Sequence, residues 1–324
     1  MQSKTCKYAK GLEIHFTGLR QCILSDRNPL YTTKYNNKSF IKDFLEVKEK
    51  MLSKMQKGII PRVCQNCFYL YDKDDNEKES PLKINYIDLF HWTQCNSACF
   101  YCSNRNLTKL KITKWKNQKG VVNALKILEN LKQLDLLDKD LIISQVGGEP
   151  TLLKEFVDIL KFVIKNNYSI YILSNGILYE KYIVKALEKT PSSSLTVSLD
   201  CGTRETYKKI KGVDEFNNVI KNLREYVIQT KDFSDKIHCK YIILEGVNDN
   251  KEEIDRWIDI CEAIGIKSFF PSIEFCHSME QKTAIPEHIC ELYEYIKEKV
   301  SCLNPFYKIC TYDFVEDYIK RRSY

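Results

Sequence analysis

The sequence predicts an α/β protein: a partial (β/α)6, TIM-like barrel preceded by a small cysteine-rich metal-binding module. Three observations lead to this fold class. Apolar, β-branched segments alternate with segments of helical spacing across residues 82–275, which favours parallel strands joined by right-handed crossovers. Six such units are too few for a closed eight-stranded barrel. Four cysteines within the first 71 residues indicate a separate metal site.

The barrel elements follow from local patterns. Residues 121–136 place Ala124, Leu125, Ile127 and further leucines at helical spacing, and residues 154–165 predict the next helix. Strands are expected at 83–92, 141–146, 169–173, 195–199, 240–244 and 267–275.

The rest of the chain divides around this barrel. Residues 1–71 form the cysteine-rich module, with a hairpin that turns at Gly18 and a lysine-rich helix around Phe44. Residues 72–81 are charged and lack apolar side chains, which predicts a linker. Residues 276–324 form a short tail with a helix at 286–300, and we expect its scattered cysteines to be packed as small apolar residues.

Three closely spaced cysteines follow the first barrel strand. Cys95, Cys99 and Cys102 fit one compact loop, and the next cysteine along the chain is Cys201. A complete four-iron cluster has four ligands, so three thiolates leave one iron open for chemistry. Zinc, which also binds closely spaced cysteines, and simple packing of three thiols are the alternatives.

A glycine-rich turn follows the second strand. Gly147 and Gly148 allow a ligand to approach the main chain. Glu149 offers a carboxylate to a cationic group, and Pro150 is suited to the first turn of a helix. Alone, this pattern is an ordinary strand-to-helix turn; placed after the cysteine loop, it indicates the second half of one site.

Polar residues also follow the later strands. In parallel α/β barrels, chemistry gathers at the carboxyl ends of the strands. The side chains expected there are Ser174, Asn175, Ser198, Asp200 and Asn248. Ordinary turn chemistry is the alternative for each, because these residue types cluster wherever strands end.

Composition narrows the function classes. The chain is 44% hydrophobic with a net charge of +7, which is mild for its size, so a nucleic-acid partner is not favoured. No run approaches the 18 apolar residues of a membrane span, and the N-terminus lacks the apolar core of a secretory signal. Fourteen cysteines without such a signal indicate a reducing, cytoplasmic location and metal chemistry.

The two motifs, in this order, resemble the radical S-adenosylmethionine (radical SAM) superfamily over roughly residues 83–275. The resemblance implies that Cys95, Cys99 and Cys102 hold a [4Fe-4S] cluster whose open iron chelates S-adenosylmethionine. It also implies that residues 147–150 contact the ligand's ammonium group and that Tyr101 lies beside the adenine. Ser174 and Asn175 resemble residues near the methionine carboxylate and ribose. Ser198 and Asp200 are expected near ribose or substrate, and Asn248 near adenine.

The N-terminal cysteines resemble the auxiliary-cluster modules called SPASM and twitch. Cys6 and Cys22 flank the hairpin, and Cys64 and Cys67 form a C-x-x-C pair. Four thiolates suit a second [4Fe-4S] cluster or a zinc ion equally. Unlike those modules, this one precedes the barrel.

The resemblance implies an enzyme that reductively cleaves S-adenosylmethionine to a 5′-deoxyadenosyl radical, which abstracts hydrogen from a substrate. The electron would come from a donor such as flavodoxin or ferredoxin. A peptide or protein side chain is the expected substrate. The alternatives are a sugar or small metabolite, RNA modification, and a non-catalytic zinc-binding interaction protein.

Overall fold

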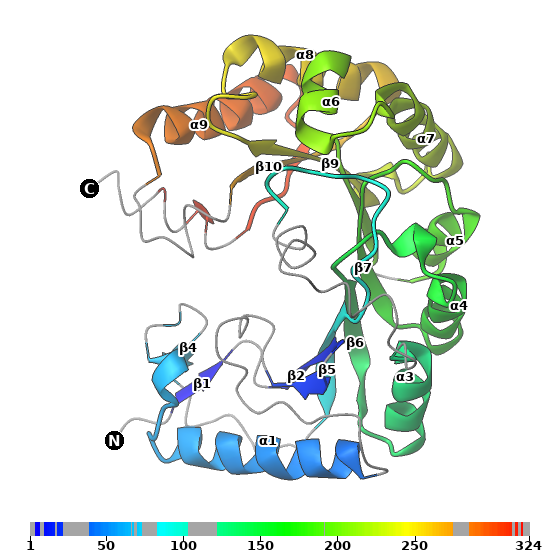
Figure 1. The fold of residues 1–324 in the computed structure, drawn as a ribbon, viewed down its shortest axis with the longest axis vertical. Helices are drawn as coiled ribbons and strands as arrows, with labels where there is room; N and C mark the ends of the chain where they lie inside the picture. Colours follow the sequence, from blue (N-terminus) through cyan, green and yellow to red (C-terminus); the bar gives the residue numbers. More distant parts are fainter. Residues whose placement is uncertain are drawn as a thin grey trace.

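The computed structural model describes residues 4–6, 10–16, 18–21, 39–65, 67, 70–72, 83–102, 122–190, 192–274, 285–312, 315–316 and 319. Its main feature is a nine-stranded sheet with the strand order β11-β10-β9-β8-β7-β6-β5-β2-β3. Figure 1 shows this sheet curving into an arc, with helices α3 to α9 along its outer side. The α/β fold is therefore a partial barrel, as predicted.

The strands of the large sheet are β2 (Gly11–His15), β3 (Gly18–Arg20), β5 (Ile84–Phe90), β6 (Leu137–Gln145), β7 (Ser169–Ser174), β8 (Ser194–Ser198), β9 (Ile237–Ile243), β10 (Ser268–Ile273) and β11 (Lys308–Ile309). Its helices are α3 (Ala124–Gln133), α4 (Phe156–Asn166), α5 (Lys181–Lys189), α6 (Arg204–Lys211), α7 (Phe216–Gln229), α8 (Lys251–Ile264) and α9 (Glu287–Leu303). Short 3₁₀ turns occur at η1 (Arg62–Cys64), η3 (Pro150–Leu152) and η4 (Ser234–Lys236). Outside the sheet lie α1 (Phe40–Gln56) and the antiparallel pair β1 (Lys4–Cys6) and β4 (Leu70–Asp72).

All six predicted barrel strands are confirmed as β5 to β10, and each pairs in parallel with its neighbour. The largest boundary difference is in β6, which begins four residues before the predicted start at 141. Its first half contains the exposed residues Lys139 and Asp140, so the apolar pattern begins late. The helix expected near Pro150 is only the 3₁₀ turn η3, and α4 begins at Phe156.

The N-terminal hairpin is confirmed, but its place differs from the expected separate module. β2 and β3 pair antiparallel, and β2 also runs parallel to β5, with Ile14 opposite Leu89. All five residues of β2 are buried. The barrel sheet thus continues into residues assigned to the N-terminal zone, because pairing between distant strands leaves no local mark in the sequence.

The outer face of the sheet packs against the helices. Trp257 of α8 lies between Tyr241 of β9 and Phe269 of β10, with ring centroids 5.0 and 5.6 Å away. Its indole Nε1 donates to Cys239 Sγ at 3.3 Å. Cys201, Cys239 and Cys261 are buried, as expected for small apolar residues, whereas Cys302 of the tail is exposed. Among the described helices, none has the length and apolar character needed to cross a membrane.

Candidate active site

The three cysteines lie on a compact loop that leaves the end of β5. The main-chain amide of Cys102 donates to the carbonyl of Cys99 at 3.3 Å, and Ser97 N donates to Cys95 Sγ at 3.4 Å. Although Cys95 as a whole residue is exposed, burial of its thiol raises the pKa of Cys95, and burial likewise raises the pKa of Cys99. Charges on Cys95 and Cys102 raise the pKa of Cys99 further, which places the three sulfurs within electrostatic reach of one another.

The glycine turn after β6 packs directly on this loop. At Gly148, where φ is +59°, an added Cβ would lie 2.7 Å from both Gln94 O and Trp92 Cδ1. At Gly147, with φ +81°, it would lie 2.8 Å from the Phe90 ring. Side chains at either position would push the loop away. The two sequence motifs therefore meet, as their order along the barrel predicted.

Glu149 is bonded to both motifs. Its main-chain amide donates to Gln94 O at 2.7 Å, and Trp92 Nε1 donates to its carbonyl at 3.1 Å. Its carboxylate is only 1% exposed, and Oε1 accepts from Thr151 N at 3.2 Å and Thr151 Oγ1 at 2.7 Å. Burial raises the pKa of Glu149 although these donors oppose the shift. The carboxylate therefore orders the turn, while its direct contact with an ammonium group stays a prediction.

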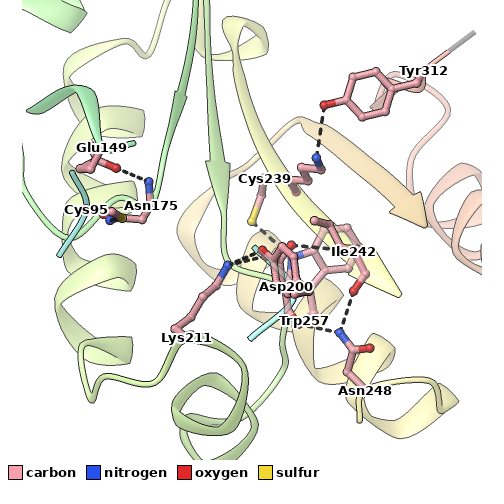
Figure 2. Close-up of polar contacts among 12 residues, drawn as sticks. Cys95, Glu149, Asn175, Asp200, Lys211, Cys239, Ile242, Asn248, Trp257 and Tyr312 are labelled. Atoms are coloured by element: carbon pink, nitrogen blue, oxygen red, sulfur yellow. Dashed lines mark hydrogen bonds and ion pairs between the residues drawn. The ribbon is translucent and has the colours of Figure 1, made fainter. Parts of the chain in front are cut away.

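Ser174 and Asn175, at the end of β7, complete the connection. Ser174 Oγ donates to Glu149 Oε1 at 2.9 Å, and Asn175 N donates to Glu149 Oε2 at 2.7 Å. Asn175 Nδ2 donates to Asn96 Oδ1 at 2.7 Å. The same nitrogen lies 3.5 Å from Cys95 Sγ, and Figure 2 shows Asn175 between Cys95 and Glu149. Asn175 thus bridges the glycine turn and the cysteine loop. Asn96 was missed in the sequence, where only its position beside Cys95 marks it.

Tyr101 and Asp200 belong to a second polar group. Tyr101 Oη donates to Asp200 Oδ2 at 2.8 Å, and the Lys211 ammonium forms an ion pair with the same carboxylate. Asp200 is fully buried, and its Oδ1 accepts from Ile242 N at 2.9 Å. Both carboxylate oxygens of Asp200 are therefore engaged within the protein, and its contact with ribose or substrate stays a prediction. Lys211 was missed because it ends a helix in which lysines are common.

Asn248 also has a supporting position. It is fully buried, its Nδ2 donates to the carbonyls of Asp200 and Ile242 at 2.8 Å each, and its Oδ1 accepts from Leu244 N at 2.7 Å. Turn chemistry thus uses both ends of the Asn248 amide, and a position of this residue near adenine stays a prediction. Ser198 is half-buried and pairs in register with Lys240 of β9.

Three of the four N-terminal cysteines lie near one another. Cys67 N donates to Cys64 O at 3.1 Å, and Cys6 is on β1, opposite Leu70. Burial raises the pKa of Cys64 to about 11, with further contributions from Cys67 and Cys6. Cys22 lies outside the described residues. Within the described ranges, no three histidine, cysteine, aspartate or glutamate side chains are arranged to hold a single metal ion.

Comparison with known proteins agrees with this geometry. Residues 89–259 match the family model of the radical SAM superfamily. A probable GTP 3′,8-cyclase of Saccharolobus islandicus (strain Y.N.15.51 / Yellowstone #2) is 29% identical over 229 residues, which are 68% of this chain and 66% of that protein. The chain thus spans slightly less than two thirds of this relative. A probable GTP 3′,8-cyclase of Metallosphaera sedula is 28% identical over 57% of this chain and 54% of that protein.

Solved structures show the same fold. The crystal structure of Streptococcus suis SuiB superposes with a TM-score of 0.54 at 17% identity, covering 87% of this chain and 57% of SuiB. SuiB bound to its precursor peptide SuiA gives a TM-score of 0.52 at 17% identity, covering 83% of this chain and 62% of SuiB. The family match includes more than half of the chain. The chain therefore belongs to the radical SAM superfamily, enzymes whose family chemistry requires S-adenosylmethionine and a [4Fe-4S] cluster.

Proposed function

We propose that the chain is a radical SAM enzyme that modifies a peptide or protein side chain, with Cys95, Cys99 and Cys102 as the ligands of the catalytic cluster. When bound, the cluster and S-adenosylmethionine supply a 5′-deoxyadenosyl radical that abstracts hydrogen from the substrate. The observation that carries the proposal is Asn175, which contacts both the Cys95 sulfur and the Glu149 carboxylate. Asn175 thereby connects the cysteine loop and the glycine turn, so that the two motifs form a single site.

The residues present fit this pair of cofactors. Three thiols on one loop match the ligands of a cluster with one open iron. The main chain at Gly147 and Gly148 lies beside the loop without side chains in the way, which supports a role in binding the methionine end of the ligand. Pro150 begins η3, and the Glu149 side chain caps it by accepting from Thr151 N, so the turn is held by its own residues.

The test compares two cysteine substitutions. Cys99→Ala removes one proposed ligand, whereas Cys302→Ala changes an exposed cysteine of α9. After anaerobic reconstitution and reduction, the Cys302 variant is expected to release 5′-deoxyadenosine at the native rate and the Cys99 variant to release none. If the Cys99 variant still cleaved S-adenosylmethionine, the assignment of Cys99 as a cluster ligand would be wrong.

The auxiliary site is the second part of the proposal. Cys6, Cys22, Cys64 and Cys67 are proposed to hold a second [4Fe-4S] cluster, with zinc as the alternative. The turn that joins Cys64 and Cys67, and the pairing of Cys6 with Leu70 three residues after Cys67, support a shared site. A second cluster would accept the electron left on an oxidised substrate, and a donor such as flavodoxin or ferredoxin would reduce the catalytic cluster. Mössbauer spectra of ⁵⁷Fe-reconstituted protein distinguish iron from zinc at this site.

The inner wall of the barrel supports a polar substrate. Because Tyr241 and Phe269 face α8, the alternating residues face inward, and Ser198, Lys240 and Phe270 lie side by side in register there. Lys240 is buried and donates to Tyr312 Oη at 3.2 Å. The fold shared with peptide-bound SuiB over most of the chain supports a peptide as the substrate.

A nucleotide is the second candidate, since the sequence relatives are named GTP 3′,8-cyclases. The reduced enzyme would be incubated with S-adenosylmethionine and either GTP or synthetic peptides from short reading frames flanking its gene. Peptide-dependent 5′-deoxyadenosine together with a mass change in the peptide supports the first candidate. A modified GTP product would replace it with the second.

A further inference from the structure

The cysteine loop is held from one side by the end of α6, a contact that no motif in the sequence marks. The amides of Ala98 and Phe100 donate to the carbonyls of Lys211 and Ile210 at 2.7 and 3.2 Å. At Gly212, where φ is +66°, an added Cβ would lie 3.0 Å from both the Cβ and the carbonyl oxygen of Ala98. A side chain at position 212 would crowd Ala98, so glycine allows the end of α6 to pack this closely against the cysteine loop.

The Lys211 side chain extends this contact into the protein interior. It is 1% exposed and pairs with the Asp200 carboxylate (Figure 2). It also donates to Tyr101 Oη at 3.2 Å. Burial is the largest single effect on the pKa of Lys211 and lowers it, but Asp200 and the other negative groups around the ammonium together raise that pKa, so the ammonium stays charged. A buried ion pair contributes little net stability compared with apolar residues of the same size. Stability alone therefore does not account for this pair.

Asp200 in turn is fixed by the ends of two strands. It has a left-handed φ of +61° just after β8. Its Oδ1 accepts from Ile242 N of β9, and its carbonyl accepts from Asn248 Nδ2 at 2.8 Å. The network thus connects Tyr101, between the second and third cysteines, to the rigid sheet.

The same network places charge beside a proposed cluster ligand. The Lys211 ammonium lies 3.2 Å from Oη of Tyr101, which stands between Cys99 and Cys102, and the Lys211 carbonyl accepts from Ala98 N, directly before Cys99, at 2.7 Å. The Asp200 carboxylate accepts from the same Tyr101 hydroxyl at 2.8 Å, so a buried cation and a buried anion both adjoin the loop. Nearby charge is one of the means by which proteins set the reduction potential of iron–sulfur clusters. A cation at this position favours the reduced cluster.

We propose that Lys211 and Asp200 are positioning residues that hold the Cys99–Tyr101 segment in place and set the reduction potential of the catalytic cluster. This inference rests on the proposed function, because it requires a cluster at Cys95, Cys99 and Cys102. Neither residue touches the reacting atoms; both act through the loop.

The experiment measures the midpoint potential of the catalytic cluster by redox titration followed by electron paramagnetic resonance. Lys211→Met removes the cation, and Lys211→Met/Asp200→Asn removes both charges and leaves no unpaired buried ion if the single variant does not fold. Lys208→Met is the control, because Lys208 is an exposed lysine of the same helix. All proteins carry Cys64→Ala and Cys67→Ala, so that only one cluster is titrated.

The expected order of the midpoint potentials among the variants is specific to a charge effect. The control should keep the native potential, and Lys211→Met should shift it to a more negative value. The double variant should lie closer to the native value than Lys211→Met does, because it also loses the opposing charge of Asp200. Clusters of unchanged potential in both Lys211 variants would overturn this inference while leaving the proposed function intact. Failure of the control protein to bind iron would overturn both.

Discussion

The main-chain amide of Asn175 donates a 2.7 Å hydrogen bond to the Oε2 atom of Glu149. This bond joins the end of β7 to the turn after β6. Because the Asn175 side chain also contacts Cys95 Sγ, disturbance of the Glu149 carboxylate is expected to loosen the Asn175 contact with the cysteine loop without removing any cluster ligand.

Glu149→Gln tests that connection. The glutamine amide would replace one carboxylate oxygen by a donor among the amides and hydroxyls of Thr151, Ser174 and Asn175, and leaving one buried donor unsatisfied costs about 1–3 kcal/mol. We expect a lower melting temperature and weaker S-adenosylmethionine binding, measured by calorimetry, with the iron content retained. The exposed Glu188→Gln serves as control. Unchanged stability would contradict the structural role of the carboxylate.

Gly148→Ala tests the contact between the two motifs. The new Cβ would meet Gln94 O and Trp92 Cδ1 at 2.7 Å, and overpacking of this kind costs about 1–3 kcal/mol in addition to the strain of a positive φ. Gly246→Ala is a matched control, because Gly246 has a φ of +70° but no atom within 4 Å of the position that a Cβ would occupy. We expect reduced iron incorporation in the Gly148 variant alone. Equal iron content in the Gly148→Ala and Gly246→Ala variants would show that the cysteine loop tolerates displacement.

Removal of the N-terminal pair tests the auxiliary site. Native protein is expected to bind about eight iron atoms per chain, and the Cys64→Ala/Cys67→Ala variant about four, with 5′-deoxyadenosine still formed without substrate. Iron and acid-labile sulfide analysis gives the result. About four iron atoms in both proteins, together with zinc in the native one, would favour the structural-zinc alternative.

The pH dependence of the unfolding free energy tests the environment of His238, a residue of β9. Burial, followed by the charge of Lys308, lowers the pKa of His238 from 6.5 to about 4, with Asp235 opposing. Its Nδ1 lies 2.6 Å from Ser268 Oγ and 3.6 Å from Cys310 Sγ. Since the unfolded chain binds this proton more readily, the stabilisation is complete above pH 6.5 and is lost as the pH falls towards 4.

The full difference corresponds to about 3 kcal/mol. In denaturant unfolding of the metal-free protein, the difference in unfolding free energy between native and His238→Gln chains should shrink as the pH falls from about 7.5 to about 4. A difference that is constant over this range would show that His238 does not titrate as described.

The sequence predicted those parts of the site that local patterns encode. The six barrel strands and the glycine turn have apolar runs and turn residues of their own, and the structure confirms them. The position of β2 beside β5 was not predictable, because strand pairing at that distance leaves no local signal. Asp200 and Asn248 were expected at ligands; because residues that build turns and residues that bind ligands are chemically alike, their buried hydrogen bonds within the protein could not be predicted. Lys211 had no signal, because its burial depends on where α6 packs.

The pairing of β2 with β5 has a practical consequence. The family match begins at Leu89, so a chain trimmed to start there would lose the hairpin and most of β5 (Ile84–Phe90), and β6 would become an exposed edge strand. An exposed edge strand can pair with strands of other molecules. Shortened versions should therefore self-associate, and recombinant work on the catalytic half needs the first twenty residues as well.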